Sequence, residues 1–179
     1  MEQVIGCILL ADFITGFIHF LEDTYLVPSS FKSFDDLVTH PNILHHKDPM
    51  HFTMGDVLHR NYHLFLAAGM VLLIAYPLGY LTWQLALITI LAALGNEIHA
   101  WSHKRPKNWF LRLLLDMKLV ISPEQHAKHH KRPYSKCYCT VTNWVNPILD
   151  GIQFWAWLEW CLKLVGIKPM RGSEQRGGF

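Results

Sequence analysis

The uncharged run at residues 64–96 constrains the fold of this chain more than any other feature. It holds 33 consecutive residues without Asp, Glu, Lys or Arg. One straight helix of that length would measure about 50 Å, whereas the hydrocarbon core of a bilayer is about 30 Å thick. A Pro-Leu-Gly sequence at 77–79 interrupts the run near its middle and favours a turn. We therefore expect two antiparallel membrane spans, the second running from about Tyr80 to His103.

A second apolar stretch, residues 3–21, contains a single charged residue, Asp12, and is long enough for a third span. Asp12, Gly16, His19 and Asp23 recur at spacings of four, three and four, so they form one stripe along a helix. The stripe could be a polar seam between packed helices, or it could face a functional site with His19 as a metal ligand. Charged groups at membrane depth usually face a cavity or a partner, which favours the site.

The remaining segments are shorter and more polar. Residues 24–53 contain three prolines and read as a loop. Residues 109–121 suit an interfacial helix. Residues 147–166 are also amphipathic and would either pack over the histidine-rich cap or lie at the interface. We expect an all-α integral membrane protein with about three transmembrane helices, interfacial helices and a His-rich cytosolic-side cap that holds a di-metal site. One domain would cover residues 1–169, followed by a disordered tail at 170–179.

Eight of the twelve histidines gather in groups at the ends of the apolar stretches. They are His19, His45, His46, His99, His103, His126, His129 and His130. Spacings of four and three residues place imidazoles on one side of a helix about one turn apart. All the groups fall on the side of the membrane away from the 77–79 turn. A single pair could be a buried polar contact, but three clusters in one short chain predict metal binding.

The number and type of these side chains indicate which metal they suit. Structural zinc takes four ligands, usually with Cys among them, and the four cysteines here form no C-x-x-C pattern. The histidines are too many for one tetrahedral ion. Two ions, each with several His ligands and an open position, would use them all. Open positions suggest oxygen chemistry, with iron the expected metal.

Charge gives a weaker indication of partners. The formal net charge is +2, which does not indicate a nucleic-acid partner, and we expect none. Basic residues nevertheless concentrate after the span that ends at His103 and around the histidines at 126–130. This bias is either a solvated face or, in a membrane protein, the mark of the cytoplasmic side, where it suits anionic headgroups. It assigns the histidine side to the cytoplasm or its equivalent.

The arrangement resembles membrane fatty-acyl desaturases and hydroxylases, which hold two irons between histidine boxes, and more closely the Kua/CarF family. The segments that carry the resemblance are ADFITGFIH at 11–19 with Asp23-Thr24, His45-His46 with Asp48-Pro49, NEIHAWSH at 96–103, 126–130, TNWVNP at 142–147, Phe154-Trp155 and Leu158-Glu159. Together they cover about residues 8–169. The family includes plasmanylethanolamine desaturase and a plant plastid desaturase that acts on phosphatidylglycerol.

The resemblance implies an O2-dependent di-iron desaturase that introduces a double bond into a phospholipid alkyl chain, giving a vinyl ether from an alkyl ether. Alternatives are desaturation or hydroxylation of an acyl chain on phosphatidylglycerol or another lipid. A membrane metal transporter is the non-enzyme alternative, although its ligands would line a path through the bilayer. No cofactor-binding motif is present, so we expect an external cytochrome b5-like or ferredoxin-like electron donor. The membrane would be the endoplasmic reticulum in a eukaryote, with a bacterial inner membrane or plastid as alternatives.

Two further sets of residues are expected near the metals. Histidine ligands need acceptors that orient them. The acidic candidates for this role, each of which could instead be a ligand itself, are Asp23, Glu97, Asp116 and Asp150.

The family pattern also leads one to expect a histidine where this chain has Gly55. If Thr53 caps the helix that follows, His59, or less favourably His63, could take over that ligand position. Both could equally be ordinary interfacial histidines.

Overall fold

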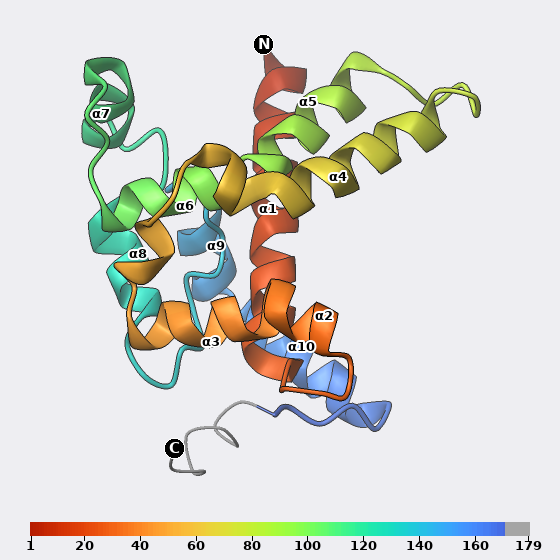
Figure 1. Ribbon diagram of the computed structural model, residues 1–179, viewed down its shortest axis with the longest axis vertical. Coiled ribbons are helices and arrows are strands. Elements are labelled where there is room, and N and C mark those ends of the chain that lie inside the picture. Colours follow the sequence, from red (N-terminus) through yellow and green to blue (C-terminus); the bar gives the residue numbers. More distant parts are fainter. Residues whose placement is uncertain (171–179) are drawn as a thin grey trace.

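The computed structural model describes residues 1–170, and these form helices and connecting segments without a β-strand. The elements are α1 Glu2–Tyr25, α2 Lys32–Phe34, η1 Asp35–Thr39, α3 His40–Lys47, η2 His51–Thr53, α4 Val57–Ala75, α5 Trp83–Ala93, α6 Gly95–His103, α7 Trp109–Asp116, α8 Pro123–His129, α9 Val145–Gly151 and α10 Phe154–Leu164. The expected all-α class is confirmed (Figure 1).

Three helices are long and apolar enough to cross a membrane: Glu2–Tyr25, Val57–Ala75 and Trp83–His103. The expected hairpin is present, because α4 and α5 pack against each other and join through a turn after Ala75. The N-terminus of α1 and this turn lie at one end of the molecule, whereas α3 and α8 gather beside the other half of α1 (Figure 1). The span Trp83–His103 is interrupted at Leu94, which separates α5 from α6.

Several expected boundaries are corrected. Thr53 does not cap α4; it lies in the short helix η2, and its hydroxyl donates to the Met50 carbonyl at 2.8 Å. Asp56 is the cap instead, since its carboxylate accepts from the His59 backbone N–H at 2.8 Å. An acid directly before a helix can satisfy its free N–H groups as well as Thr can. The helix therefore begins at Val57, three residues later than expected.

The segment expected to be a loop is largely helical. Residues 32–47 form a continuous run of α2, η1 and α3, with a π-helical turn at Asp35–Thr39. Pro41 does not break it, because it sits in the first turn of α3, where a missing N–H is tolerated. This run places His45 and His46 on one helix.

The amphipathic stretch at 147–166 forms two helices rather than one. α9 and α10 are separated by Gln153, whose φ of 54° lies in the left-handed region. Trp155 packs inward against Phe20 and Tyr138, at ring-centroid distances of 5.2 and 5.0 Å. Trp157 and Trp160 on the same helix are exposed. This aromatic cluster holds α10 against the half of α1 that carries His19.

The predicted tail falls mainly outside the described residues, which end at 170. The backbone N–H of Met170 donates to the Thr24 carbonyl at 2.7 Å, which ties this residue to the end of α1.

Candidate metal centre

Four helices bring nine possible ligand side chains together beside the C-terminal half of α1. The residues are His19 and Asp23 from α1, His45 and His46 from α3, His99 and His103 from α6, and His126, His129 and His130 from α8 and its C-cap. They form two groups, and within each group one potential ligand atom per residue lies within 4.8 Å of every other. Eight of the nine histidines expected as ligands are therefore close together; His59 is not among them.

The first, which we call the five-histidine group, consists of His45, His99, His103, His126 and His130. The Nε2 atom of His126 lies 2.7 Å from that of His99, and 2.9 Å from those of His103 and His130. One ring nitrogen carries either one proton or one lone pair, so it cannot make three hydrogen bonds with three similar atoms. A shared cation would satisfy all of them at once.

Their spacing also fits a coordination sphere. Nitrogen ligands bound at about 2.0–2.1 Å to one ion lie about 3 Å apart, and the Nε2 separations here run from 2.7 to 3.3 Å. His45 completes the group, and neither of its ring nitrogens has a hydrogen-bond partner within residues 1–170. The position of these atoms matches ligands more closely than a hydrogen-bonded network.

The second, the three-histidine–aspartate group, consists of His19, Asp23, His46 and His129. The Asp23 carboxylate lies at its centre, with Oδ1 2.9 Å from His46 Nε2. Its Oδ2 is 3.1 Å from His129 Nε2 and 3.5 Å from His19 Nε2. Asp23 was expected as an orienting acceptor or possible ligand, and its oxygens lie at ligand distance from the imidazoles.

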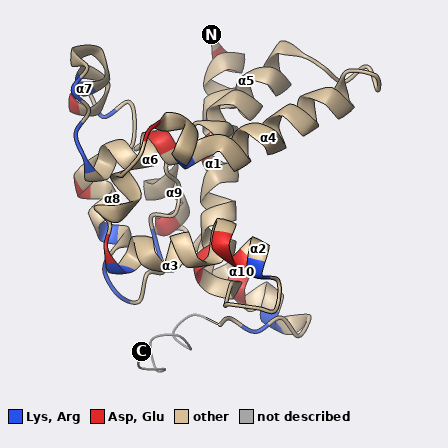
Figure 2. Ribbon diagram, viewed as in Figure 1, with Lys and Arg blue, Asp and Glu red and all other residues tan. Residues whose placement is uncertain are grey.

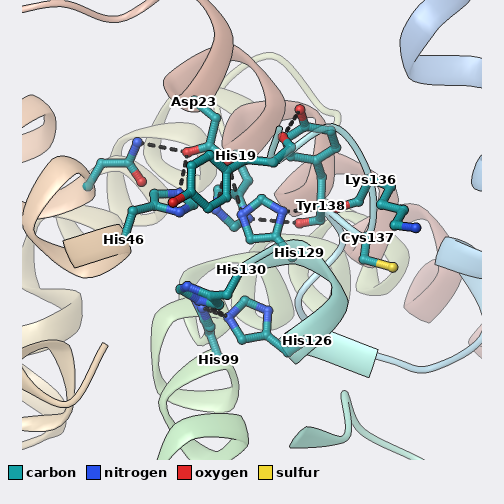
Figure 3. A network of polar contacts seen from close by, with 12 residues as sticks. His19, Asp23, His46, His99, His126, His129, His130, Lys136, Cys137 and Tyr138 are labelled. Atoms are coloured by element: carbon teal, nitrogen blue, oxygen red, sulfur yellow. Dashed lines mark hydrogen bonds and ion pairs between the residues drawn. The ribbon is translucent and has the colours of Figure 1, made fainter. Parts of the chain in front are cut away.

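Backbone carbonyls fix the orientation of two of these rings (Figure 3). His19 Nδ1 donates to the Tyr138 carbonyl at 3.0 Å, and His129 Nδ1 donates to the Lys136 carbonyl at 2.9 Å. In the neutral ring the proton on Nδ1 leaves a lone pair on Nε2, and both Nε2 atoms face the same Asp23 oxygen. Two lone pairs and a carboxylate facing each other repel unless a cation lies between them.

The segment that supplies these carbonyls was not anticipated, because a backbone oxygen leaves no signature in the sequence. Asp12 holds it in place: the carboxylate accepts from the Val141 N–H at 2.7 Å and from the Thr142 hydroxyl at 2.5 Å. The Asn146 side chain also bonds both the N–H and the carbonyl of Cys139. The α1 stripe thus has two functions, since its deeper part anchors the segment and its outer part supplies His19 and Asp23.

Electrostatics favour the neutral form of His45, His126 and His130, three histidines outside the spans. Burial, reinforced by neighbouring imidazoles, lowers the pKa of His130 to about 3. The same two causes hold the pKa values of His45 and His126 well below the usual range. Neutral imidazole is the form that binds metal, so these side chains are ready to act as ligands at neutral pH.

The two groups lie next to each other. Ring centroids are 5.6 Å apart for His19 and His99, and 5.2 Å apart for His46 and His130. Two cations held by these groups would therefore be close enough to act on one small molecule. The donor set contains imidazole and carboxylate without thiolate, which suits iron and disfavours a structural zinc site.

The other expected acidic residues have different roles in the structure. Glu97 pairs with Arg60, at 2.6 Å, and accepts from the Trp101 indole at 2.8 Å. Asp116 is exposed and pairs with Arg105. Asp150 accepts from the backbone N–H of Cys137 at 3.2 Å, so it supports the carbonyl-bearing segment rather than an imidazole.

The two candidate substitutes for a histidine at Gly55 also lie outside both groups. His59 is exposed, and Gly55 has a φ of +79°. A Cβ at Gly55 would lie 2.7 Å from the His59 ring. Because L-residues rarely adopt this φ, a side chain here would be strained. His59 and His63 instead line a neighbouring cavity.

That cavity has a volume of about 540 Å³ and reaches the metal centre. His19, His45 and His99 form part of its wall. The rest of the wall combines apolar side chains, including Ile18, Leu37, Val38, Leu44, Phe52 and Leu64, with polar or charged ones such as Glu22, Asp36 and Arg60. A cavity with both kinds of wall suits an amphipathic ligand.

Known proteins with similar sequences show to which family this chain belongs. The family model described as a lipid desaturase domain matches residues 8–172. Plasmanylethanolamine desaturase of Myxococcus xanthus is 28% identical, with 93% of this chain and 63% of that protein covered. Plasmanylethanolamine desaturase 1 of Mus musculus is 30% identical, with 93% and 66% covered.

A probable fatty acid desaturase of Acanthamoeba polyphaga mimivirus is 30% identical, with 93% of this chain and 84% of that protein covered. The chain thus spans slightly less than two thirds of the two plasmanylethanolamine desaturases. No solved structure matches it. Because the family match covers nearly the whole chain, including all nine potential ligands, this protein belongs to the lipid desaturase domain family.

Proposed function

We propose that this protein is an O2-dependent di-iron desaturase of membrane phospholipids. The observation that carries the proposal is the pair of adjacent ligand groups, three of whose histidines line a cavity with a partly apolar wall. The five-histidine group would hold one iron, and the three-histidine–aspartate group would hold the other. Bound there, two irons would supply the reductive activation of O2 that breaks unactivated C–H bonds.

The net reaction balances only with an external electron source. The lipid loses two hydrogens from neighbouring carbons, which leaves a double bond, and these carry two electrons and two protons. A carrier protein supplies two more electrons, and two further protons come from water. O2 receives all four electrons and four protons and becomes two water molecules. The expected partners are thus a membrane phospholipid and an electron carrier of the cytochrome b5-like or ferredoxin-like kind.

The protein contributes position and exclusion of water. The apolar part of the cavity wall holds a lipid chain beside the rings of His19 and His99, and fixing reactants in this way removes much of the entropic barrier. The Tyr138 and Lys136 carbonyls keep two imidazoles in one tautomer and orientation.

For the substrate we favour an alkyl ether phospholipid that is converted to a vinyl ether. Two relatives that match 93% of this chain are plasmanylethanolamine desaturases, which supports this choice. Acyl-chain desaturation is the second candidate, supported by the relative named a probable fatty acid desaturase. The membrane would be the endoplasmic reticulum in a eukaryote, or a bacterial inner membrane or plastid.

A metal transporter explains the structure less well. Transport needs ligands distributed along a path through the bilayer, whereas these nine ligand candidates lie in two adjoining groups at one end of the spans. Tight, stoichiometric binding of two irons would support the enzyme, and exchangeable or variable metal would support transport.

The test is expression in a host that lacks plasmalogens, followed by lipid profiling and iron analysis of the purified protein. We expect two irons per chain and new vinyl ether lipids. His103→Ala and His129→Ala should each abolish product and lower bound iron, because each removes a candidate ligand from a different group. His51→Ala is the matched control and should retain both irons, since this histidine lies outside the groups. Full activity in His103→Ala or His129→Ala would refute the ligand assignment.

A further inference from the structure

Four exposed cations follow one another along α8 and the loop after it: Lys128, Lys131, Arg132 and Lys136. We call them the basic face. None of them has a carboxylate within 4.0 Å among the residues that the structure describes. Figure 2 shows Lys and Arg positions in blue on α8 and on the loop that follows it, at one edge of the molecule. Unpaired like charges on one surface repel each other and suit an acidic partner.

The basic face directly borders the metal centre. His130 precedes Lys131 in the chain, and the Lys136 carbonyl accepts from His129 Nδ1. Within the five-histidine group, His103 and His130 are partly exposed, whereas the other three histidines are buried. The ligand groups therefore approach solvent beside these four cations.

The basic face is separate from the cavity assigned to the lipid. None of its four residues lines that cavity, and neither His103 nor His130 does. The cavity instead reaches the centre through His19, His45 and His99. A second molecule could thus contact the centre at the basic face while a lipid chain occupies the cavity.

Two simpler explanations account for only part of this surface. Cations near a helix C-terminus interact favourably with the helix dipole, which explains Lys128 and Lys131. Arg132 and Lys136 lie in the loop beyond α8, where that effect has faded.

Anionic lipid headgroups would also attract cations. A membrane-bound surface usually combines cations with exposed apolar side chains. No large hydrophobic residue is exposed between residues 118 and 143, whereas Trp109, Phe110 and Leu113 are exposed on α7. The lipid explanation therefore suits α7 and its cations better than it suits the basic face.

We propose that the basic face is the docking surface for an acidic, soluble one-electron carrier protein, which delivers its electrons at the edge formed by His103 and His130. This rests on the proposed function, which requires two external electrons per double bond. Complementary charge acts mainly on the association rate, so the carrier would be steered to this edge and released after each transfer.

The experiment measures binding and turnover separately. Iron-loaded protein in nanodiscs of zwitterionic lipid is mixed in a stopped-flow instrument with two acidic probes, a plant-type [2Fe–2S] ferredoxin and a soluble cytochrome b5 haem domain. Lys131→Glu/Arg132→Glu should lower the association rate at low ionic strength by about tenfold or more and flatten its salt dependence. Lys107→Glu/Arg112→Glu is the matched control, with the same charge change on and beside α7, and should leave the rate unchanged.

Further measurements distinguish a docking defect from a damaged metal centre and from failure of the proposed function. Lys131→Gln/Arg132→Gln should lower the association rate by a smaller factor, and bound iron in each variant reports whether the centre is intact. Dithionite with a small mediator replaces the carrier: product from the variant under dithionite, but not with the carrier, supports the docking surface. No product from wild type under dithionite would refute the proposed function itself.

Equal association rates for wild type and the Lys131/Arg132 variants with both probes would overturn the docking proposal, as would the absence of salt-dependent association with either probe. The assay is repeated in nanodiscs that contain anionic lipid. A variant defect that persists under dithionite and appears only with anionic lipid would assign these cations to the membrane surface instead.

Discussion

Replacement of Gly16 by alanine should damage the metal centre although Gly16 is not itself a candidate ligand. A Cβ at this position would lie 2.5 Å from the Cys139 Sγ and 3.0 Å from the Cα and backbone N of Cys139. Ordinary contacts begin at 3.4 Å, so the backbone of Cys139 must move by about 0.4 Å even if its thiol rotates away. The Asn146 side chain bonds both sides of Cys139 and resists that movement.

The loss of stability and the displacement of the Tyr138 carbonyl can be estimated from the same contacts. Overpacking of this kind costs about 1–3 kcal/mol, which corresponds to a fall in Tm of about 2–12 °C for a chain of this size. Tyr138 precedes Cys139, and its carbonyl accepts from His19 at 3.0 Å. A shift of 0.4 Å away from α1 would lengthen this bond to about 3.4 Å, beyond the usual range. His19 would then lose its fixed orientation, and the three-histidine–aspartate group would bind iron more weakly.

Gly6→Ala on the same helix is the matched control, because a Cβ there meets no atom within 4 Å. Alanine is the better helix former by about 1 kcal/mol, so this variant should be as stable as wild type or slightly more so. The assay is thermal unfolding in detergent together with iron content and lipid product. Cys139→Ala combined with Gly16→Ala should recover only the part of the loss that the thiol causes. A Gly16→Ala protein with the Tm and iron content of Gly6→Ala would refute the reasoning.

Three further predictions follow from individual contacts. His59→Ala should keep both irons and raise the KM for lipid, because His59 lines the cavity outside both ligand groups; loss of one iron would instead make it a ligand, and iron analysis decides. Cysteines placed at Leu78 and Lys131 should react with an impermeant thiol reagent from opposite sides of the membrane, and labelling from one side would contradict the hairpin. Cys137 should be alkylated more slowly than the partly exposed Cys161 at pH 8, as followed by mass spectrometry of peptides. Burial and a hydrogen bond to Asp150 raise the pKa of Cys137 to about 12, so little thiolate is present at that pH; equal rates would contradict this.

The sequence predicted the parts of this protein that follow from periodicity. An uncharged run too long for one span specified the α4–α5 hairpin. The spacing of His99 from His103, and of His126 from His130, correctly indicated that each pair projects from one side of a helix. Such patterns are readable because a helix repeats its faces every three to four residues, so the spacing alone determines which side chains meet.

Features that depend on contacts between distant segments were not predictable in this way. The Tyr138 and Lys136 carbonyls orient two imidazoles, but every residue has a carbonyl, so the sequence does not distinguish these two. Glu97 was expected to orient a histidine ligand, but its position two residues before His99 directs it toward Arg60 on α4. Three prolines predicted a loop over residues 24–53, but Pro41 lies in the first turn of α3, where proline is tolerated.

The sequence allowed two interpretations of the α1 stripe: a polar seam between packed segments, or a face directed at a functional site. In the structure both apply. Asp12 and Gly16 lie deep in the span and fix the position of the 138–142 segment, through hydrogen bonds and through close backbone approach. His19 lies on the same face and receives its orientation from a carbonyl of that segment. One helical face therefore both supplies candidate ligands and positions the backbone that orients them. Because α1 is rigid between Asp12 and His19, the packing of the span and the geometry of the metal centre cannot change independently.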